Sequence, residues 1–243
     1  MTEKKVVLIS GGTSGIGLAA AQILLHQGWT PVLLGRDEEK GRAAERKLPG
    51  SVFLACDITN SAACDEAAEK AAAMGVIQGV VVSAGIYGEG LLENATDEEI
   101  HRFFSVNVYG AMYLCRAALP YMKSCGGAVV TVASDAALEG NVQCSLYGAT
   151  KGALVAFTRS FALEAAVYGI RVNAVCPGDV DTPLLARQIS QYGGNRSDMG
   201  EQYPLGRIGK AEEVGEVIAF LLSEKASFMT GAAVPVDGGL TDW

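Results

Sequence analysis

A tyrosine and a lysine one helical turn apart are the first residues in this sequence that could do chemistry. Tyr147 and Lys151 stand in the segment Ser-Leu-Tyr-Gly-Ala-Thr-Lys, and a helix there places both on one face. An unperturbed tyrosine has a pKa of about 10, so general-base work near pH 7 needs phenolate stabilisation on the order of 4 kcal/mol. The Lys151 ammonium is placed to supply much of it. By itself the pair also fits an ordinary exposed helix surface.

A serine earlier in the chain makes the pair more informative. Ser134 directly follows an apolar run at 127–133, which predicts a buried strand. Ligands of open α/β sheets lie at the carboxyl ends of the strands. A serine at a strand end, then a loop, then Tyr147 and Lys151 is a demanding combination that indicates a catalytic site.

A glycine-rich segment near the N-terminus predicts a cofactor. The residues Gly-Gly-Thr-Ser-Gly-Ile-Gly at 11–17 lie between an expected strand at 5–10 and an apolar-periodic helix. Glycines let the backbone turn sharply and approach a pyrophosphate, whose charge meets the helix N-terminus. No Gly-Lys-Ser/Thr follows Gly17, so a nucleoside-triphosphatase loop is disfavoured. The alternative to a dinucleotide cradle is a structural turn without a ligand.

The end of the second expected strand bears on which dinucleotide binds. That strand ends in Gly35 and Arg36, where dinucleotide folds place the group that meets the adenosine ribose. A carboxylate there repels a 2′-phosphate, whereas an arginine accommodates it with a charge-assisted fork. The pattern favours NADP(H) over NAD(H). The alternative is a solvated Arg36 paired with Asp37 or Glu38.

The elements that must position these residues alternate between short apolar runs and longer segments of helical period, a pattern typical of βαβ units. Strands are expected at 5–10, 31–35, 51–55, 78–83, 127–133, 170–175 and 232–236. Helices are expected at 15–28, 37–47, 60–74, 97–123, 145–168 and 211–223, with an irregular stretch at 183–204. No linker or repeat interrupts this order. We therefore predict an α/β fold: one doubly wound, Rossmann-type domain over 1–243, with a seven-stranded parallel sheet and helices on both faces.

Taken together, the motifs resemble one family over essentially the whole chain. The matching pieces are Gly11 to Gly17, Asp57, Ser83-Ala84-Gly85, Asn107, Ser134, Tyr147, Lys151, Pro177-Gly178 with Thr182, and Val236-Asp237-Gly238-Gly239. The sequence closely resembles the short-chain dehydrogenases/reductases, in their single-domain branch.

That resemblance implies hydride transfer between NADP(H), or alternatively NAD(H), and a carbonyl or alcohol. It implies that Tyr147 is the general acid or base, that Ser134 binds the substrate oxygen, and that Asn107, at a helix irregularity, holds a water that passes protons to Lys151. It also places Asp57 and Ile58 near adenine. The full set of cofactor contacts that it implies is Gly11, Thr13, Ser14, Gly15, Ile16, Gly17, Arg36, Asp57, Ile58, Ser83, Ala84, Gly85, Tyr147, Lys151, Pro177, Gly178, Val180 and Thr182.

Three residues near the site carry open questions. Ser83 stands where the family usually has asparagine, a residue that mostly steadies the sheet. Asp135 follows Ser134 where a small or hydroxyl residue is common, and its carboxylate either points into the substrate mouth or caps the loop. Cys144 falls just before Tyr147, so we expect it near the site.

Composition excludes several other function classes. The chain has 243 residues, a net charge of −8 and no long basic run, which argues against nucleic acid or an anionic membrane as partner. Six scattered cysteines and two histidines without a Cys-x-x-Cys pair make a metal site improbable and favour a reducing cytoplasm. The apolar run after the first residues is too short for a signal peptide or membrane span.

Two other functions share some of these motifs. A non-catalytic dinucleotide sensor usually loses a catalytic residue, and this chain keeps all four. A sugar-nucleotide epimerase needs a C-terminal substrate domain, for which too few residues follow Thr182.

Substrate and assembly depend on the remaining segments. We expect 135–146 and 183–204 to form a loop and mobile lid over the site. Few basic residues flank the expected site, so a free small or medium carbonyl compound is favoured over a 3-oxoacyl group on an acidic carrier protein, unless Arg159, Arg171 and Arg187 form a patch. The apolar, glycine-rich ending at 228–239 fits a homotetramer.

Overall fold

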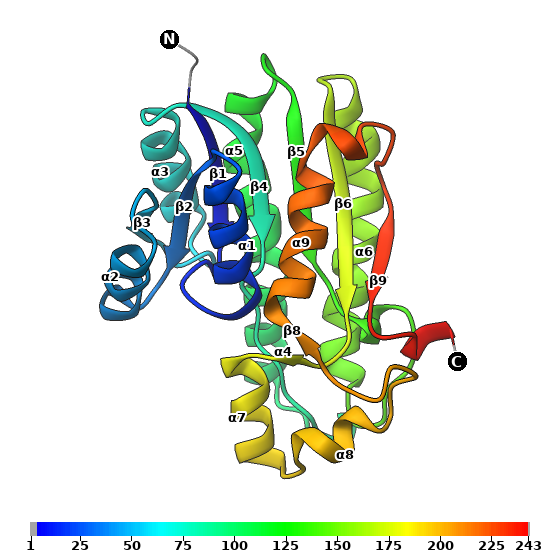
Figure 1. Ribbon diagram of the computed structural model, residues 1–243. Helices are drawn as coiled ribbons and strands as arrows, with labels where there is room; N and C mark the ends of the chain where they lie inside the picture. Colours follow the sequence, from blue (N-terminus) through cyan, green and yellow to red (C-terminus); the bar gives the residue numbers. More distant parts are fainter. Residues whose placement is uncertain (1–3, 243) are drawn as a thin grey trace.

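The computed structural model describes residues 4–242, so residues 1–3 and 243 of the expected domain lie outside it. A parallel sheet of seven strands dominates this part of the chain, in the order β3-β2-β1-β4-β5-β6-β9 (Figure 1). Its strands are β1 (Lys5–Ser10), β2 (Thr30–Gly35), β3 (Val52–Ala55), β4 (Val76–Val82), β5 (Gly127–Val132), β6 (Ile170–Pro177) and β9 (Ala233–Val236). The expected parallel seven-stranded sheet is confirmed.

Helices cover both faces of the sheet because its strands are apolar on both sides. Along β1, Val6 and Leu8 pack into one core layer, and Val7 and Ile9 pack into the other, as the two-residue period of a strand requires. The first layer is closed by α3 (Ser61–Ala72), α5 (Gly110–Met122) and α6 (Ser145–Ala166). The second is closed by α1 (Gly15–His26), α2 (Glu38–Lys47) and α9 (Ala211–Leu222). In Figure 1, α1 and α9 lie in front of the sheet and α6 lies behind it.

Side chains fix where several helices begin. The Asp37 carboxylate accepts the Lys40 N–H at the start of α2, and Asn60 accepts the N–H groups of Ala62 and Ala63 at the start of α3. Such caps satisfy backbone donors that have no partner inside the helix. Thr96 and Glu99 form a reciprocal capping box at the start of α4 (Asp97–Phe104).

The helix expected at 97–123 is interrupted, so that prediction is wrong in its middle. After α4, the π-helical segment η2 (Ser105–Tyr109) intervenes before α5 begins. The cause is tertiary, because the Asn107 amide in this segment bonds to the backbone of Ile86, which follows β4. π-Helical turns are rare and frequently occur at functional sites.

The stretch at 183–204 is more regular than expected. It contains α7 (Pro183–Tyr192) and α8 (Arg196–Gly200). Thr182 accepts the Leu185 N–H at the start of α7, and Pro183 occupies the first turn, where its missing N–H has no consequence. The sequence also gave no sign of a small parallel pair formed by β7 (Val180–Asp181) and β8 (Gly209–Lys210).

The connections place all the expected site segments at one end of the sheet. The strand order reverses between β1 and β4, and ligands of open α/β sheets bind at such a switch point, beyond the carboxyl ends of the strands. These ends face the bottom of Figure 1, where α7 and α8 lie below the sheet. Within residues 4–242, no helix is long and apolar enough to cross a lipid bilayer.

Candidate active site

The glycine loop lies tightly against the end of β4. Gly11 has a φ of +65°, and a Cβ added to it would lie 2.9 Å from the backbone nitrogen of Ala84. A Cβ on Gly17 would lie 2.5 Å from the Gly11 carbonyl oxygen. Neither position has room for a side chain, so the loop is a close backbone turn.

The loop presents the start of α1 to the expected cofactor position. No side chain among the described residues caps this helix at Ser14, unlike the starts of α2 and α3. Its first N–H groups are therefore available to an anion, which the helix dipole also favours. A Cβ on Gly15 would lie 3.3 Å from the Thr182 methyl group, so the start of α7 borders the same position. This uncapped cradle, close-packed at its glycines, fits the pyrophosphate of a dinucleotide.

The residues after β6 complete the rim of the cradle. Pro177 ends β6, and Gly178 packs so closely on Tyr203 that an added Cβ would lie 2.7 Å from that ring. Val180 lies in β7, and its carbonyl accepts the hydroxyl of Thr182. These four predicted contacts thus lie on one short segment that leads into α7.

The arginine after β2, Arg36, is largely exposed and makes one long ion pair. Arg36 lies 3.9 Å from the Asp57 carboxylate, and its side chain is 68% exposed. It does not pair with Asp37 or Glu38, since Asp37 pairs with Lys40 at 3.0 Å. Asp57 is held mainly by Thr59, whose backbone N–H and hydroxyl it accepts.

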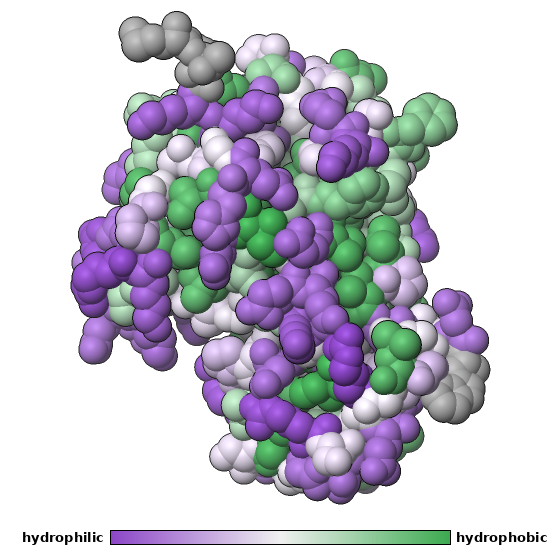
Figure 2. All heavy atoms as spheres, viewed as in Figure 1, coloured by the Kyte–Doolittle hydropathy of each residue, from purple (hydrophilic) through white to green (hydrophobic). Residues whose placement is uncertain are grey.

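At Gly35, the end of β2, an added side chain would crowd the glycine loop. A Cβ there would lie 3.0 Å from the Thr13 methyl group, so Thr13 of the glycine loop contacts the end of β2. Next to it, Ile58 is buried against Gly110, the first residue of α5. Figure 2 shows hydrophilic side chains gathered at the left edge, over α2, which follows Arg36 in the chain.

Ser10 is a site-shaping residue that sequence reasoning missed. Its buried hydroxyl accepts the backbone N–H groups of Ser83 and Ala84, each at 3.2 Å. The link between β1 and the end of β4 therefore runs through the Ser83 main chain, and serine in place of the family's asparagine leaves it intact. A serine ending an otherwise apolar strand was the available signal.

The expected catalytic side chains come together at the ends of β5 and α6. Ser134, Tyr147 and Lys151 are all less than 9% exposed. The Lys151 ammonium donates to the Val132 carbonyl at 2.8 Å and lies 5.6 Å from the centroid of the Tyr147 ring. A Cβ on Gly85 would lie 3.6 Å from the Lys151 nitrogen and 3.4 Å from the Asn107 amide oxygen, so Gly85, Asn107 and Lys151 are neighbours.

Burial changes the pKa values of both groups of the Tyr-x-x-x-Lys motif. Burial raises the pKa of Tyr147, while a hydrogen bond with the Ser134 side chain acts in the opposite direction. Burial also lowers the pKa of Lys151 to about 8. We expected Lys151 to lower the tyrosine pKa, but burial dominates and raises it. At pH 7, Tyr147 is therefore a neutral phenol that can donate a proton.

Asn107 holds the loop after β4 against α6. Its side-chain oxygen accepts the Ile86 N–H, and its two amide hydrogens go to the Ile86 carbonyl and the Thr150 hydroxyl. The Thr150 hydroxyl in turn donates to the Tyr147 carbonyl. Asn107 is thus coupled to the helix turn that carries Tyr147, and its amide hydrogens have no capacity left for a water.

Asp135 combines the two orientations considered for it. One of its carboxylate oxygens accepts the Ser134 hydroxyl at 2.6 Å and the Ala136 N–H at 2.8 Å. Both contacts lie at the start of the short turn η3 (Asp135–Ala137), whose cap is Ser134, and the first joins the carboxylate to that serine. Burial raises the pKa of Asp135, and the charge of Asp237 adds to that effect.

An aromatic and acidic wall faces Tyr147 from the loop after β4. The Tyr87 ring packs edge-on against Tyr147, with centroids 4.8 Å apart, and its hydroxyl donates to Glu89. Glu89 also accepts the Gln188 amide at 3.1 Å, so α7 covers this wall. Cys144 lies 3.5 Å from the Tyr87 hydroxyl, as expected for a residue near the site.

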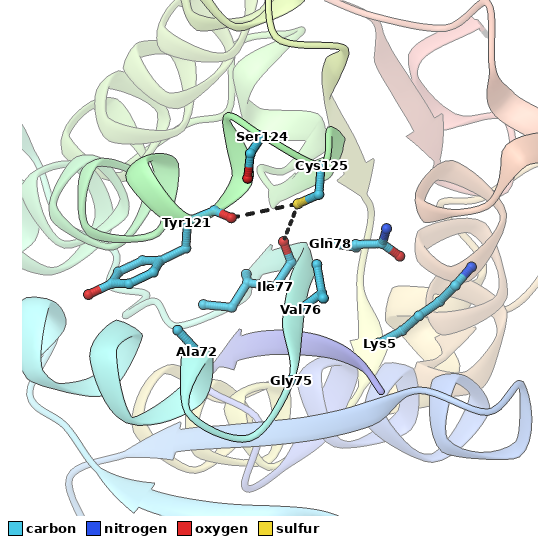
Figure 3. Close-up of a pocket in the computed structure, with 9 residues that line it drawn as sticks. All are labelled: Lys5, Ala72, Gly75, Val76, Ile77, Gln78, Tyr121, Ser124 and Cys125. Carbon is cyan, nitrogen blue, oxygen red and sulfur yellow. Dashed lines mark hydrogen bonds between the residues drawn. The ribbon is translucent and has the colours of Figure 1, made fainter. Parts of the chain in front are cut away.

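A separate cavity of about 550 Å³ lies at the opposite, amino-terminal end of the sheet. Figure 3 shows Lys5 and Tyr121 on two sides of it, with the Cys125 sulfur directed at the carbonyls of Ile77 and Tyr121. None of the predicted site residues lines it. Although it is spacious, it gathers no acid–base pair, so we place the chemistry at the other end. Within 4–242, no three His, Cys, Asp or Glu side chains are grouped to hold a metal ion.

Comparison with known proteins identifies the family. A family profile described as enoyl-(acyl carrier protein) reductase matches residues 11–241. Trans-4-hydroxycyclohexanecarboxylate dehydrogenase of Sinomonas cyclohexanicum is 34% identical, over 98% of this chain and 93% of its own. Carbonyl reductase family member 4 of Xenopus tropicalis is also 34% identical, over 97% and 98%. The chain belongs to the short-chain dehydrogenase/reductase family.

Solved structures of this dehydrogenase/reductase family agree with the fold. Ligand-free aldohexose dehydrogenase of Thermoplasma acidophilum superposes with a TM-score of 0.91 at 32% identity, covering 99% of this chain and 95% of its own. A structure described as ElxO with NADP bound has the same TM-score at 28% identity and covers both chains fully. The chain is therefore an oxidoreductase of this family, built to interconvert alcohols and carbonyls.

Proposed function

We propose that this protein is an NADP(H)-dependent oxidoreductase that interconverts a ketone or aldehyde and an alcohol, with Tyr147 as the general acid and base. The observation that carries the proposal is the buried group of Ser134, Tyr147 and Lys151 beside an uncapped glycine cradle. Tyr147 lies in this group as a neutral phenol, the form required to protonate a carbonyl oxygen.

The chain's own residues fit an NADP(H) molecule along the rim of the sheet. The backbone of Gly11 to Gly17 would hold the pyrophosphate, and Thr182 would close the cradle over it. Arg36 would meet the 2′-phosphate, supported by its exposure and its weak pairing with Asp57. When bound, the nicotinamide supplies or accepts the hydride. The NADP-bound relative supports this choice, with NAD(H) as the alternative.

Each catalytic side chain then has one task. Ser134 donates a hydrogen bond to the substrate oxygen, and Tyr147 gives that oxygen a proton in reduction or removes one in oxidation. Lys151 keeps a positive charge near the phenol and ties the end of β5 to α6. Asn107 positions the Tyr147 turn through Thr150.

The favoured substrate is a free small or medium carbonyl compound. Glu89, Asp135, Asp179 and Asp237 surround the site, and none forms an ion pair within the described part of the chain. The charged members of this acidic set oppose the approach of an acidic carrier protein.

Two of the three arginines that could form a compensating patch, Arg171 and Arg187, lie apart. Arg171 is at the amino end of β6, bonded to the carbonyls of Ser223 and Met229, whereas Arg187 is on α7 at the other end of the sheet. A 3-oxoacyl carrier-protein substrate is the second candidate, because the description of the matching profile names an acyl carrier protein, although with an enoyl group.

Two further features belong to the same proposal. The segment 183–204 acts as a lid, because α7 reaches Glu89 through Gln188. The chain assembles as a homotetramer in the cytoplasm: the Phe228 ring is fully exposed next to edge strand β9, and buried cysteine thiols such as Cys56 and Cys115 suit a reducing compartment.

Turnover with a panel of carbonyl compounds tests the proposal. The purified protein should consume NADPH with at least one free ketone or aldehyde, measured as loss of nicotinamide absorbance, and the same panel with NADH should react more slowly. A carrier-linked 3-oxoacyl substrate with kcat/KM more than about tenfold above its free thioester, falling steeply with salt, contradicts the substrate assignment. Tight NADPH binding without any turnover instead supports a dinucleotide sensor. A monomer in light scattering at micromolar concentration contradicts the tetramer.

A further inference from the structure

We propose that Asp135 is a positioning residue that decides where the Ser134 hydroxyl hydrogen points. When charged, Asp135 takes that hydrogen, and when protonated, it releases the hydrogen to the substrate oxygen. The inference rests on the proposed carbonyl reduction, because it concerns the group that would polarise the carbonyl. It makes the protonation of Asp135 a condition for full activity in the direction of reduction.

The geometry follows from the small number of hydrogens in the pair. Ser134 has one hydroxyl hydrogen, and its oxygen lies 2.6 Å from the Asp135 carboxylate, within the range of an O–H···O⁻ bond. The Ala136 N–H points at both groups, at 3.3 Å from the Ser134 oxygen and 2.8 Å from the Asp135 oxygen. The Ala136 N–H therefore only donates to these two oxygens and supplies no acceptor for the Ser134 hydrogen. When Asp135 is charged, its carboxylate takes that hydrogen, and Ser134 has none left to donate to a substrate.

A protonated Asp135 reverses the bond. Its carboxyl hydrogen is then donated to the Ser134 oxygen, and the Ser134 hydrogen turns to the substrate oxygen, next to Tyr147. The proton that reaches the product comes from Tyr147, and Asp135 keeps its own proton throughout the cycle. Asp135 therefore acts through Ser134 and contacts no reacting atom.

The surroundings of Asp135 favour the protonated form. Burial raises its pKa, and the Ser134 and Ala136 bonds act in the opposite direction. No ion pair reaches it within residues 4–242. The titratable groups around it are Glu139 on its own turn, Tyr87 and Glu89 after β4, Cys144, Tyr147 and Lys151 on α6 or at its start, Cys176, Asp179 and Tyr203 around the end of β6, and Asp237 after β9.

The pH dependence of carbonyl reduction by Asp135→Asn tests the inference. In the wild type, kcat/KM for reduction should fall at least about tenfold as pH rises through the ionisation of Asp135, because the Ser134 donor is then lost. Asparagine does not titrate, and its side-chain oxygen fits the position that accepts the Ala136 N–H, where it also accepts the Ser134 hydrogen at every pH. The step should therefore be absent from the variant, whose activity should stay near the low level that the wild type reaches at high pH. Any fall near pH 8 that comes from Lys151 should remain in both proteins.

Glu139→Gln is the matched control. It removes a carboxylate from the same turn that acts on Asp135 by charge and makes no bond to Ser134. This variant should keep the Asp135 step, moved slightly to lower pH. An identical pH profile for the wild type and Asp135→Asn overturns the inference. If Glu139→Gln also loses the step, the inference is overturned as well, because the step then reflects the total charge near the site and not the bond between Asp135 and Ser134.

A measurement without turnover separates this inference from the proposed function. Carboxyl ¹³C NMR should give Asp135 in the NADPH-bound protein a pKa above the ordinary aspartate range, and Ser134→Ala should raise that pKa further because the donated bond is lost. An Asp135 pKa unaffected by Ser134→Ala overturns the pairing, even if Asp135→Asn fails to fold. Absence of turnover in the wild type with this NMR result intact contradicts only the proposed function.

Discussion

The two halves of the candidate site are formed by different parts of the residues, the backbone in one half and side chains in the other. On the β1–α1 side, the cradle consists of backbone, since Gly11, Gly15 and Gly17 lie where a side chain would collide or crowd its neighbours. On the β5–α6 side, the catalytic group consists of buried polar side chains, with Tyr147 and Lys151 both desolvated. A cradle of backbone depends on the absence of atoms, whereas a catalytic group depends on particular atoms and on their charge.

This difference teaches where each half is vulnerable. The cradle should fail when a methyl group is added, and it should be indifferent to pH. The catalytic half should fail when a single oxygen or nitrogen is removed, and its contribution to stability should change with pH.

Removing the Tyr147 hydroxyl should have the largest effect. Tyr147→Phe keeps the ring and its contact with Tyr87 but removes the proton carrier, so carbonyl reduction should fall at least about 10²-fold. NADPH binding, measured by fluorescence titration, should be largely kept. Tyr87→Phe removes a phenol hydroxyl from the same aromatic pair and should lose less than about tenfold. A Tyr147→Phe enzyme with wild-type turnover shows that the acid is another group.

Adding one methyl group to the cradle should come next. In Gly17→Ala the new Cβ would lie 2.5 Å from the Gly11 carbonyl oxygen, so the loop must move. Overpacking of this kind should lower the free energy of unfolding by about 2–3 kcal/mol and weaken dinucleotide binding.

Gly152→Ala is the control for that change. Gly152 also lies in a helix, α6, and a Cβ there would meet no atom within 4 Å. Alanine should be neutral or stabilising there by up to about 1 kcal/mol. Calorimetry of the two variants checks both values, and an unchanged melting temperature for Gly17→Ala contradicts the tight turn.

Removing the Arg36 guanidinium tests the charged end of the cradle. Arg36→Ala should weaken NADP(H) binding by about 1.5–3 kcal/mol and leave NAD(H) binding nearly unchanged. Lys40→Ala, which removes a nearby cation paired with Asp37, should affect both cofactors little. Equal kinetics of the wild type with NADP(H) and NAD(H) would falsify the assignment of Arg36.

The smallest expected effect is a pH-dependent gain in stability from Lys151. Its pKa is about 8 in the folded protein and near the ordinary 10.5 when unfolded. Between these values the unfolded chain binds more protons, so stability should rise with pH. From pH 7.5 to 9.5 the wild type should gain on the order of 1–2 kcal/mol relative to Lys151→Met in urea unfolding. Parallel stability profiles for the two proteins rule out a desolvated Lys151.

The sequence predicted what local pattern controls. Short continuous apolar runs such as that of β1 predicted a sheet covered on both faces, and the spacing of Ser134, Tyr147 and Lys151 predicted that these side chains come together. The glycine spacing gave the cradle. In each case the information lies within a short segment or in the order of segments.

What the sequence could not predict depends on contacts between distant segments. Helical periodicity runs through the η2 segment without a break, so only the family resemblance led us to expect an irregularity at Asn107, and the bonds from Asn107 to Ile86 show what holds it. The sign of the Tyr147 pKa change depends on burial, which no spacing shows. The Asp135 orientation depends on a shared hydrogen with Ser134. By contrast, Thr182 and Pro183 form a recognisable helix-start pattern at α7, although only an irregular stretch was predicted there.

The π-helical segment η2 also bears on how this chain tolerates length changes. An α-helix turns about 100° per residue, and a π turn holds one residue more than an α turn. Deletion of a single residue in 105–109 would therefore let α4 and α5 join as one regular helix of good geometry. The same deletion would rotate the amide of Asn107 away from Ile86 and Thr150. A chain one residue shorter would therefore keep the helix but lose the hydrogen bonds through which Asn107 holds the Tyr147 turn.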